Sequence, residues 1–268
     1  GLRGRGRGGG GGATGSEGAE TAGPSVVTGV KAIEPFDFAS LEGWDNFYSS
    51  ASSGVDGTGD GVVELEEYEW HPSLPHSAFA SCIPRGSSII VIGCGSSSLP
   101  RYIYDVHEGE TSVCCLDYSS ACVDALRERD GSGRERMTFV RADATRLEEL
   151  EWDVVLSDNI GLGGPSYRPF DVVIDKGLID ALMCGEGWDY DVQRLIKSVS
   201  SILKEDGGLY LLGSFKLSSS TKEFLVETGG EVGMAWEFSE EAEKMSGSGM
   251  NNGRAELSRG VLQRNGVA

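Results

Sequence analysis

Two glycines and two acidic residues follow consecutive apolar runs, in an arrangement typical of a nucleoside-binding site. Gly93 and Gly95 come directly after the apolar run 88–92. Glycines at such a turn let a ligand approach the backbone, and the N–H groups that begin the next helix attract a negative group. Asp117 and Asp143 come at the ends of the next two apolar runs. The first carboxylate is placed to accept ribose hydroxyl groups, and the second to reach an adenine amino group.

Each of these features also has a purely structural explanation. A Gly-x-Gly turn closes tightly between a strand and a helix, and a single acidic residue caps a helix N-terminus. The glycine turn, Asp117 and Asp143 follow three successive predicted strands, and this coincidence favours a nucleoside cofactor over the separate structural explanations. A dinucleotide site would require a third glycine where Ser98 stands. Because S-adenosylmethionine carries no phosphate, the absence of that glycine favours S-adenosylmethionine.

The elements that must position these groups alternate between strand and helix. Short apolar runs predict buried strands, and apolar residues at helical spacing predict amphipathic helices. The predicted strands are 88–92, 112–116, 137–140, 170–174 and 209–212, with late strands within 231–238 and 257–263. The predicted helices are 96–107, 119–129, 178–183, 191–205 and 221–228. This order predicts an α/β fold with a doubly wound, mostly parallel seven-stranded sheet.

One strand pattern occurs twice. The sequence WDVVL at 152–156 resembles FDVVI at 170–174, and glycines and a proline lie between the two copies. A predicted helix follows the second copy directly. We therefore expect 170–174 to be the sheet strand and residues from about 151 to 168 to be an insertion.

Composition limits the organisation and the partners of the chain. Forty of the 268 residues are glycine, and residues 1–35 form an Arg/Gly-rich stretch that predicts a disordered leader before a single domain at 36–268. The formal net charge is −19. Such an acidic chain favours basic partners and makes nucleic acid an unfavourable ligand, apart from weak contacts by the Arg-Gly leader.

The cysteines and histidines do not form a metal-binding pattern. The six cysteines include no CxxC pair, and none of the three histidines lies at metal-ligand spacing from a cysteine. We therefore expect no metal site and reduced cysteines in the core. No run of apolar residues is long enough to span a membrane, and no signal peptide is evident, so a cytoplasmic protein is expected.

Five strings of residues, in this order, resemble a known family. They are Trp44-Asp45-Asn46-Phe47-Tyr48, Glu67-Tyr68-Glu69-Trp70, Val91-Ile92-Gly93-Cys94-Gly95-Ser96-Ser97, Asp117-Tyr118-Ser119-Ser120 and the run from Phe170 through Asp175-Lys176-Gly177 to Asp180-Ala181-Leu182. Together, over about residues 36–214, they resemble the class I methyltransferases that modify lysines of translation elongation factor 1-alpha. The endothelin-converting-enzyme-associated and methyltransferase-like members are the most similar. The resemblance implies a Rossmann-like class I methyltransferase fold and S-adenosylmethionine as cofactor.

The resemblance also implies roles for residues before and after the first strand. By this resemblance Trp44, Tyr48 and Tyr68 close over the cofactor from the N-terminal side. Gly93 and Gly95 pass beside its methionine portion.

Further along the chain, the resemblance implies that Asp117 and Tyr118 hold the ribose and flank the adenine. Asp143 and Ala144 hold the adenine edge, and Lys176 approaches the amino-acid end of the cofactor. The chain departs from many class I enzymes at Val91, where an acidic residue is common.

The expected reaction is methylation of a lysine in a basic protein, with an elongation factor as the example. We expect an acidic rim that recruits the protein and an aromatic neck that desolvates the amine, with Tyr68, Trp70 and Asp175 as candidates for the neck. No histidine lies in the strand-end motifs, so no catalytic residue is assigned. The alternatives are methylation of a small molecule or a protein N-terminus, and an inactive module that binds the cofactor.

Overall fold

A single mixed sheet organises the part of the chain that the structure describes. The computed structural model describes residues 38, 40–51, 67–157, 170–238 and 255–263. The predicted leader lies outside these residues, so its disorder stays a prediction. The strands are β1 (Ser88–Ile92), β2 (Ser112–Asp117), β3 (Met137–Arg141), β4 (Val172–Lys176), β5 (Leu209–Phe215), β6 (Met234–Glu237) and β7 (Ala255–Leu262). The helices are α1 (Leu41–Ala51), α2 (His76–Ala80), α3 (Leu99–Val106), α4 (Ser120–Asp130), the 3₁₀ helix η1 (Ala144–Glu149), α5 (Trp152–Ser157), α6 (Leu178–Leu182), α7 (Trp188–Ile202) and α8 (Ser219–Glu231).

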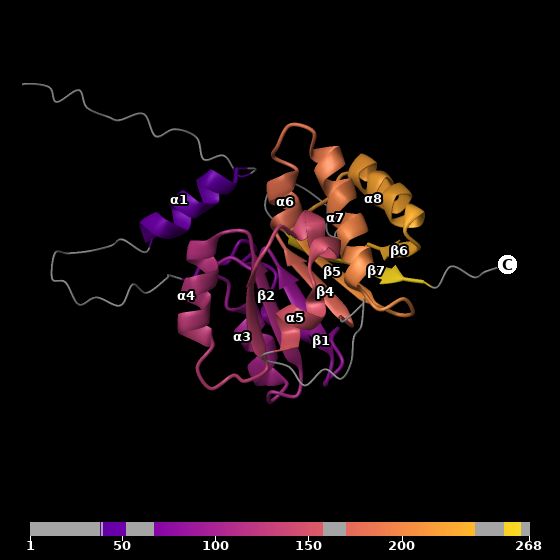
Figure 1. Ribbon diagram of the computed structural model, residues 1–268. Helices are drawn as coiled ribbons and strands as arrows, with labels where there is room; N and C mark the ends of the chain where they lie inside the picture. The colour runs from indigo at the N-terminus through magenta and orange to yellow at the C-terminus, as the bar shows by residue number, and fades with distance from the viewer. Residues whose placement is uncertain (1–37, 39, 52–66, 158–169, 239–254, 264–268) are drawn as a thin grey trace, which may run out of the picture. The chain divides into compact units, whose positions relative to one another are not determined.

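The sheet has the order β3-β2-β1-β4-β5-β7-β6 (Figure 1). The first five strands are parallel, and β7 runs antiparallel to both of its neighbours. In the ladder, Ile92 pairs with Leu116 on one side and with Asp175 on the other, so the carboxyl ends of the central strands lie at one edge. The predicted doubly wound, seven-stranded sheet is confirmed. No helix among the described residues is both long and apolar enough to cross a membrane.

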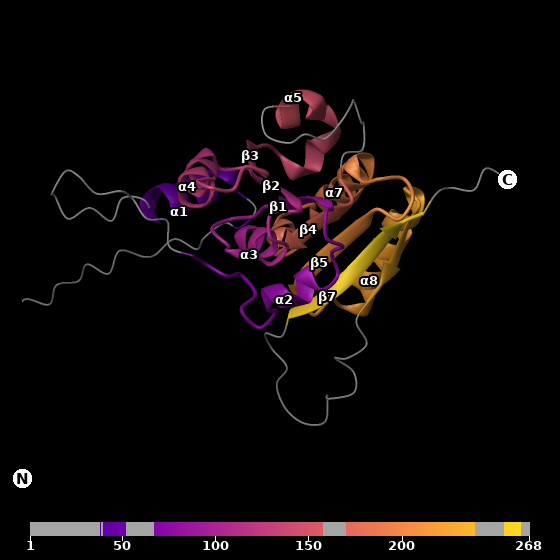
Figure 2. The ribbon, with the colours of Figure 1, turned by 90° about the horizontal axis from the view of Figure 1, so that it is seen from below.

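Alternate residues of the buried strands pack into two cores, one on each face of the sheet. Ile89 and Val91 of β1 join a core with residues of α1, α2, α3 and α4. Ile90 and Ile92 join a second core with residues of η1, α5 and α7. Figure 2 shows α2 and α3 on one side of the sheet and α5 and α7 on the other. Strands covered on both faces consist of nearly continuous apolar residues, which explains why the sequence located them.

Three predicted elements are shifted along the chain. The helix predicted at 191–205 is α7, which begins at Trp188 after Gly187 in the left-handed conformation and ends at Ile202. It ends there because Leu203 adopts an extended conformation and forms an isolated bridge with Phe170. Phe170 pairs with Leu203 in this bridge and is not part of β4. The strand predicted at 170–174 therefore begins later, because the ladder between β4 and β1 starts at Val172. The helix predicted at 96–107 also begins later, at Leu99.

The first copy of the repeated pattern is a helix and not a strand. Trp152 and Leu156 of α5 are buried in the second core, and the Trp152 ring contacts the Phe170 ring at 5.0 Å between centroids. The predicted choice of the second copy as the sheet strand is therefore confirmed. The remainder of the expected insertion lies outside the described residues.

The six cysteines are free thiols, and four of them are buried. The buried cysteines are Cys94, Cys114, Cys115 and Cys122. Cys82 is half-buried, and Cys184 is exposed after α6. The expectation that all six are core residues is therefore wrong for Cys184.

Candidate active site

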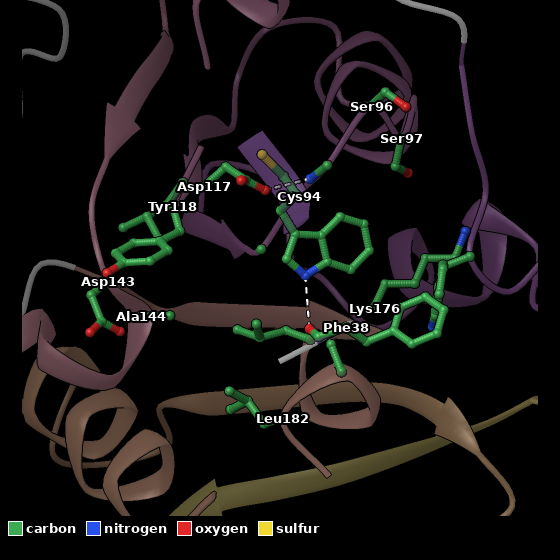
Figure 3. Close-up of a pocket in the computed structure, with 18 of the residues that line it drawn as sticks. Phe38, Cys94, Ser96, Ser97, Asp117, Tyr118, Asp143, Ala144, Lys176 and Leu182 are labelled. Atoms are coloured by element: carbon green, nitrogen blue, oxygen red, sulfur yellow. Dashed lines mark hydrogen bonds between the residues drawn. The ribbon is translucent and has the colours of Figure 1, made fainter. Parts of the chain in front are cut away.

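A cavity of about 310 Å³ lies beyond the carboxyl ends of β1, β2, β3 and β4. All ten residues predicted for the site line it, namely Trp44, Tyr48, Tyr68, Gly93, Gly95, Asp117, Tyr118, Asp143, Ala144 and Lys176. Figure 3 shows Asp117, Tyr118 and Asp143 on one side of the cavity and Ser96, Ser97 and Lys176 on the opposite side. The structure thus brings the predicted residues together, and their individual roles stay predictions.

The turn after β1 brings bare backbone to the cavity wall. Gly93 and Gly95 have φ angles of +55° and +51°, a region that residues with a Cβ rarely adopt. A Cβ at position 95 would lie only 2.7 Å from the Tyr48 hydroxyl oxygen. The two glycines therefore allow both the shape of the turn and the close approach of Tyr48.

Asp117 joins the ends of β1 and β2. One carboxylate oxygen accepts a hydrogen bond from the Gly95 N–H at 2.9 Å, and the other accepts one from the Ser119 N–H at 3.0 Å. Burial raises the pKa of Asp117, and these two N–H groups oppose the rise. Each oxygen keeps a further lone pair, so the carboxylate can still accept hydrogen bonds from a ligand.

Asp143 is the N-cap of η1. Its Oδ1 accepts hydrogen bonds from the Thr145 N–H at 2.9 Å and from the Thr145 hydroxyl at 2.8 Å. The structural explanation for this carboxylate is therefore correct, and the residue lines the cavity as well. Tyr118, which is 45% exposed, also lines the cavity.

Aromatic side chains from α1 and from the segment 67–71 form another wall. The Trp44 ring stacks on Tyr48 at 6.0 Å between centroids, and it meets the edge of Trp70 at 5.9 Å. The Trp44 indole N–H donates to the Phe38 carbonyl oxygen at 2.9 Å (Figure 3). Trp70 packs against Gly177, where a Cβ would lie 2.2 Å from the ring. The buried Trp70 N–H has no acceptor among the described residues.

Glu69 is a further residue of this site, and its role is not predictable from the sequence alone. Its carboxylate forms an ion pair with Lys176 and contacts His76 at 3.1 Å. It also accepts hydrogen bonds from the Ser98 N–H at 2.9 Å and from the hydroxyls of Ser97 and Ser98. Burial acts to raise the pKa of Glu69, but the hydrogen bonds from His76 and Lys176 outweigh it and hold the pKa well below its usual range.

His71 lies outside the strand-end motifs in the sequence, yet in the structure it contacts one of them. Its Nε2 lies 2.8 Å from Oδ2 of Asp180, which is in α6, and the His71 side chain is 1% exposed. The ring also meets the Phe215 ring at 4.6 Å between centroids. The pair joins residues 109 positions apart, a relation that the sequence carries no signal for.

The prediction of Asp175 as part of the neck is wrong. Its side chain is fully buried and does not line the cavity. The carboxylate accepts hydrogen bonds from the N–H groups of Leu178 and Ile179 and from the Tyr210 hydroxyl. Burial above all raises the pKa of Asp175 to about 7, with a further contribution from Asp180. Asp175 therefore stabilises the start of α6 from within the protein.

Comparison with known proteins gives a consistent result. Residues 90–209 match the model of a methyltransferase domain. The chain is 28% identical over 177 residues to the eEF1A lysine and N-terminal methyltransferase of Mus musculus, covering 65% of this chain and 21% of that protein. It is 30% identical to EEF1A lysine methyltransferase 4 of Bos taurus, covering 58% and 57%. It is 24% identical to a mitochondrial citrate synthase-lysine N-methyltransferase of Danio rerio, covering 61% and 62%.

A solved structure supports the fold. The structure described as "Conversion of a Disulfide Bond into a Thioacetal Group during Echinomycin Biosynthesis" aligns with a TM-score of 0.50 and 16% identity, covering 84% of this chain and 94% of that one. The chain spans about a fifth of the length of the first curated relatives, so their whole activity does not transfer with the match. Residues 90–209 thus form a methyltransferase domain with S-adenosylmethionine as its cofactor, and the chain resembles the eEF1A lysine methyltransferases.

Proposed function

We propose that this chain transfers the methyl group of S-adenosylmethionine to a lysine side chain of a basic protein, with a translation elongation factor as the first candidate. The observation that carries this proposal is the single cavity that gathers the ten residues predicted from the lysine methyltransferase motifs. The names of the relatives support the type of substrate. The net charge of −19 supports a basic partner.

The residues of the cavity fit the two halves of S-adenosylmethionine. Asp117 and Asp143 offer carboxylate oxygens on one side, as hydroxyl and amino groups require. On the opposite side, Lys176 and its ion-pair partner Glu69 present the two charges that the ammonium and carboxylate of the cofactor's amino-acid end require (Figure 3). Between these two sides, the backbone of Gly93 and Gly95 carries no side chains and therefore permits the close approach of the cofactor. When bound, S-adenosylmethionine supplies an electrophilic methyl group for an in-line displacement.

The protein must mainly orient a neutral amine toward that methyl group. A lysine has a reference pKa of about 10.4, so its deprotonation at pH 7 costs roughly 4.6 kcal/mol. Carboxylates beside the amine would increase this cost, and an apolar surrounding reduces it. The aromatic groups of Tyr68 and Trp70 line the cavity and provide such a surrounding. Correct orientation of the reactants contributes about 7–11 kcal/mol to methyl transfer.

A protein N-terminus is the second candidate substrate. The relative from Mus musculus is named for both lysine and N-terminal methylation. An N-terminal amine has a reference pKa of about 7.7–8.0 and needs less help to lose its proton. The lysine proposal and this alternative place the same demands on the cofactor side of the cavity.

Protein methylation with isotopically labelled S-adenosylmethionine tests the proposal. The chain is mixed with purified elongation factor 1-alpha, citrate synthase or a cytosolic extract, and the modified residue is located by mass spectrometry. We expect methyl-lysine in the elongation factor and none in citrate synthase. Label on an N-terminal amine or on a small molecule would replace the proposal with that alternative.

Two variants make the experiment decisive. Asp117→Asn removes the charge of a cavity carboxylate and should reduce the label when S-adenosylmethionine is below saturation. Asp124→Asn makes the same change on the exposed face of α4, where Asp124 contacts Arg127, and should leave the label unchanged. If the wild-type chain binds S-adenosylhomocysteine but transfers no methyl group to any of these substrates, it is a binding module and the proposal fails.

A further inference from the structure

The N-terminus of α3 is occupied by a carboxylate of the chain itself. Ser98 is the N-cap of α3, but its side chain does not cap the helix. Instead Glu69 accepts hydrogen bonds from the Ser98 N–H at 2.9 Å and from the Ser97 hydroxyl. Glu69 is 28 to 29 residues away in sequence from these partners, so the contact is made by the fold and not by local capping.

This position has a particular meaning in a doubly wound sheet. The helix that follows the first strand points its N-terminus at the ligand cavity, and its free N–H groups attract phosphate groups. In this chain the Ser98 N–H already has an anionic partner, the Leu99 N–H donates to the Ser97 hydroxyl at 3.1 Å, and Pro100 has no N–H. Lys176, the buried cation beside the same cavity, is paired with Glu69 as well. Both groups that would attract a phosphate are therefore neutralised by one side chain.

We infer that Glu69 is a specificity-determining residue that excludes nucleosides bearing a 5′-phosphate from the cavity. Asp117 and Glu69 accept hydrogen bonds from the same turn, which follows β1. Asp117 accepts from Gly95, and Glu69 accepts from Ser97 and Ser98. A ligand with its ribose at Asp117 would bring its 5′ substituent close to Glu69 if that substituent followed this turn. A phosphate there meets a like charge, whereas the sulfonium of S-adenosylmethionine meets an opposite one.

The charge of Glu69 is maintained by its partners. His76 and Lys176 both contribute to keeping the pKa of Glu69 below its usual range, so the group is ionised at neutral pH. Removal of the carboxylate charge would leave the Lys176 ammonium, which lines the cavity, and the Ser98 N–H without an anion. That arrangement is suited to binding phosphate, so the loss of Glu69 should produce a gain of binding.

The test compares adenosine with ADP, which differ only in the pyrophosphate. Dissociation constants are measured by calorimetric displacement of S-adenosylhomocysteine, without divalent cations, for the wild-type chain and for Glu69→Gln. In the wild type we expect ADP to bind at least tenfold more weakly than adenosine. In Glu69→Gln we expect this ratio to fall by tenfold or more. Adenosine serves as the internal measure of folding, because its half of the ligand is held on the Asp117 side.

Glu67→Gln is the matched control. Glu67 lies two residues away, pairs with Arg101 and does not line the cavity, so its ratio should equal that of the wild type. The inference is overturned if Glu69→Gln changes the ratio by less than twofold. The inference is also overturned if the wild-type chain binds ADP as tightly as adenosine, or if it binds neither of the two. Both of these outcomes are measured on the wild-type chain alone.

The result is independent of the protein substrate. No methyl group is transferred in the binding experiment, and no elongation factor is present. If the lysine proposal fails, the expected ratio of the ADP and adenosine dissociation constants is unchanged. If this ratio differs from the expected one, the expected result of the methylation experiment is unchanged.

Discussion

The substitution Gly177→Ala tests the packing on which the aromatic wall depends. Gly177 is the N-cap of α6 and has a φ of +100°. An alanine Cβ there would lie 2.2 Å from Cδ1 of Trp70, where ordinary contacts begin at 3.4 Å, so the ring must retreat by about an ångström. The left-handed backbone costs an alanine about 1–2 kcal/mol. Forcing a packed ring aside costs about 1–3 kcal/mol more.

A second glycine provides the control for backbone strain. Gly187 is the N-cap of α7 with a φ of +73°, and a Cβ there would have nothing within 4 Å. Gly187→Ala should therefore lower the free energy of unfolding by about 1–2 kcal/mol. Gly177→Ala should lower it by about 2–5 kcal/mol, the excess being due to Trp70.

Urea denaturation followed by circular dichroism measures both free energies of unfolding, and calorimetry measures the affinity for S-adenosylhomocysteine. Because Trp70 lines the cavity and Gly187 does not, we expect weaker ligand binding only in Gly177→Ala. Equal stabilities of the two variants, with equal affinities, would refute the packing of Trp70 against Gly177.

Three further experiments test other parts of the site. Asp117→Asn should weaken S-adenosylhomocysteine binding by about 1–3 kcal/mol, measured by calorimetry, because hydrogen bonds to a charged acceptor are the stronger ones; an unchanged affinity would remove Asp117 from the ribose site. The pKa of Asp175 is about 7 in the folded protein and about 3.9 in the unfolded chain, so this carboxyl contributes stability that is present below pH ~4 and lost as the pH rises through 7. Relative to Asp175→Asn, the wild type should therefore lose stability between pH 4 and 8, and parallel curves would contradict the shift. The variants His71→Ala, Asp180→Asn and their combination should reveal a coupling free energy of about 1–3 kcal/mol in urea denaturation, and simple additivity would show that the pair contributes nothing.

The sheet and one half of the site could be predicted because they depend on local sequence. A strand buried on both faces must be apolar throughout, so the runs before Gly93 and Asp117 locate two of the strands. Parallel strands then place the residues that follow them at one edge of the sheet, whatever the details of the helices. The ends of α7 could not be predicted in this way, because the bridge between Leu203 and Phe170 ends the helix before its apolar periodicity does.

The other half of the site depends on contacts between distant residues. Glu69 acquires its role from Lys176, which is 107 residues away, and His71 from Asp180, which is 109 residues away. Nothing in the types or spacing of these residues indicates the pairing. Asp175 shows the converse error, since an acidic residue beside a strand end resembled a site residue but is buried beneath the cavity.

These distant contacts also explain the string Asp-Lys-Gly-x-x-Asp, which spans residues 175–180. Asp175 accepts hydrogen bonds from the first N–H groups of α6, Lys176 pairs with Glu69, Gly177 accommodates Trp70, and Asp180 pairs with His71. Three consecutive residues of the segment 67–71 are thus each held by a different member of the string. The string therefore fixes one wall of the cavity through its contacts with the segment 67–71. A substitution in it should accordingly weaken cofactor binding and stability together, which distinguishes it from the loss of a group that acts only during transfer.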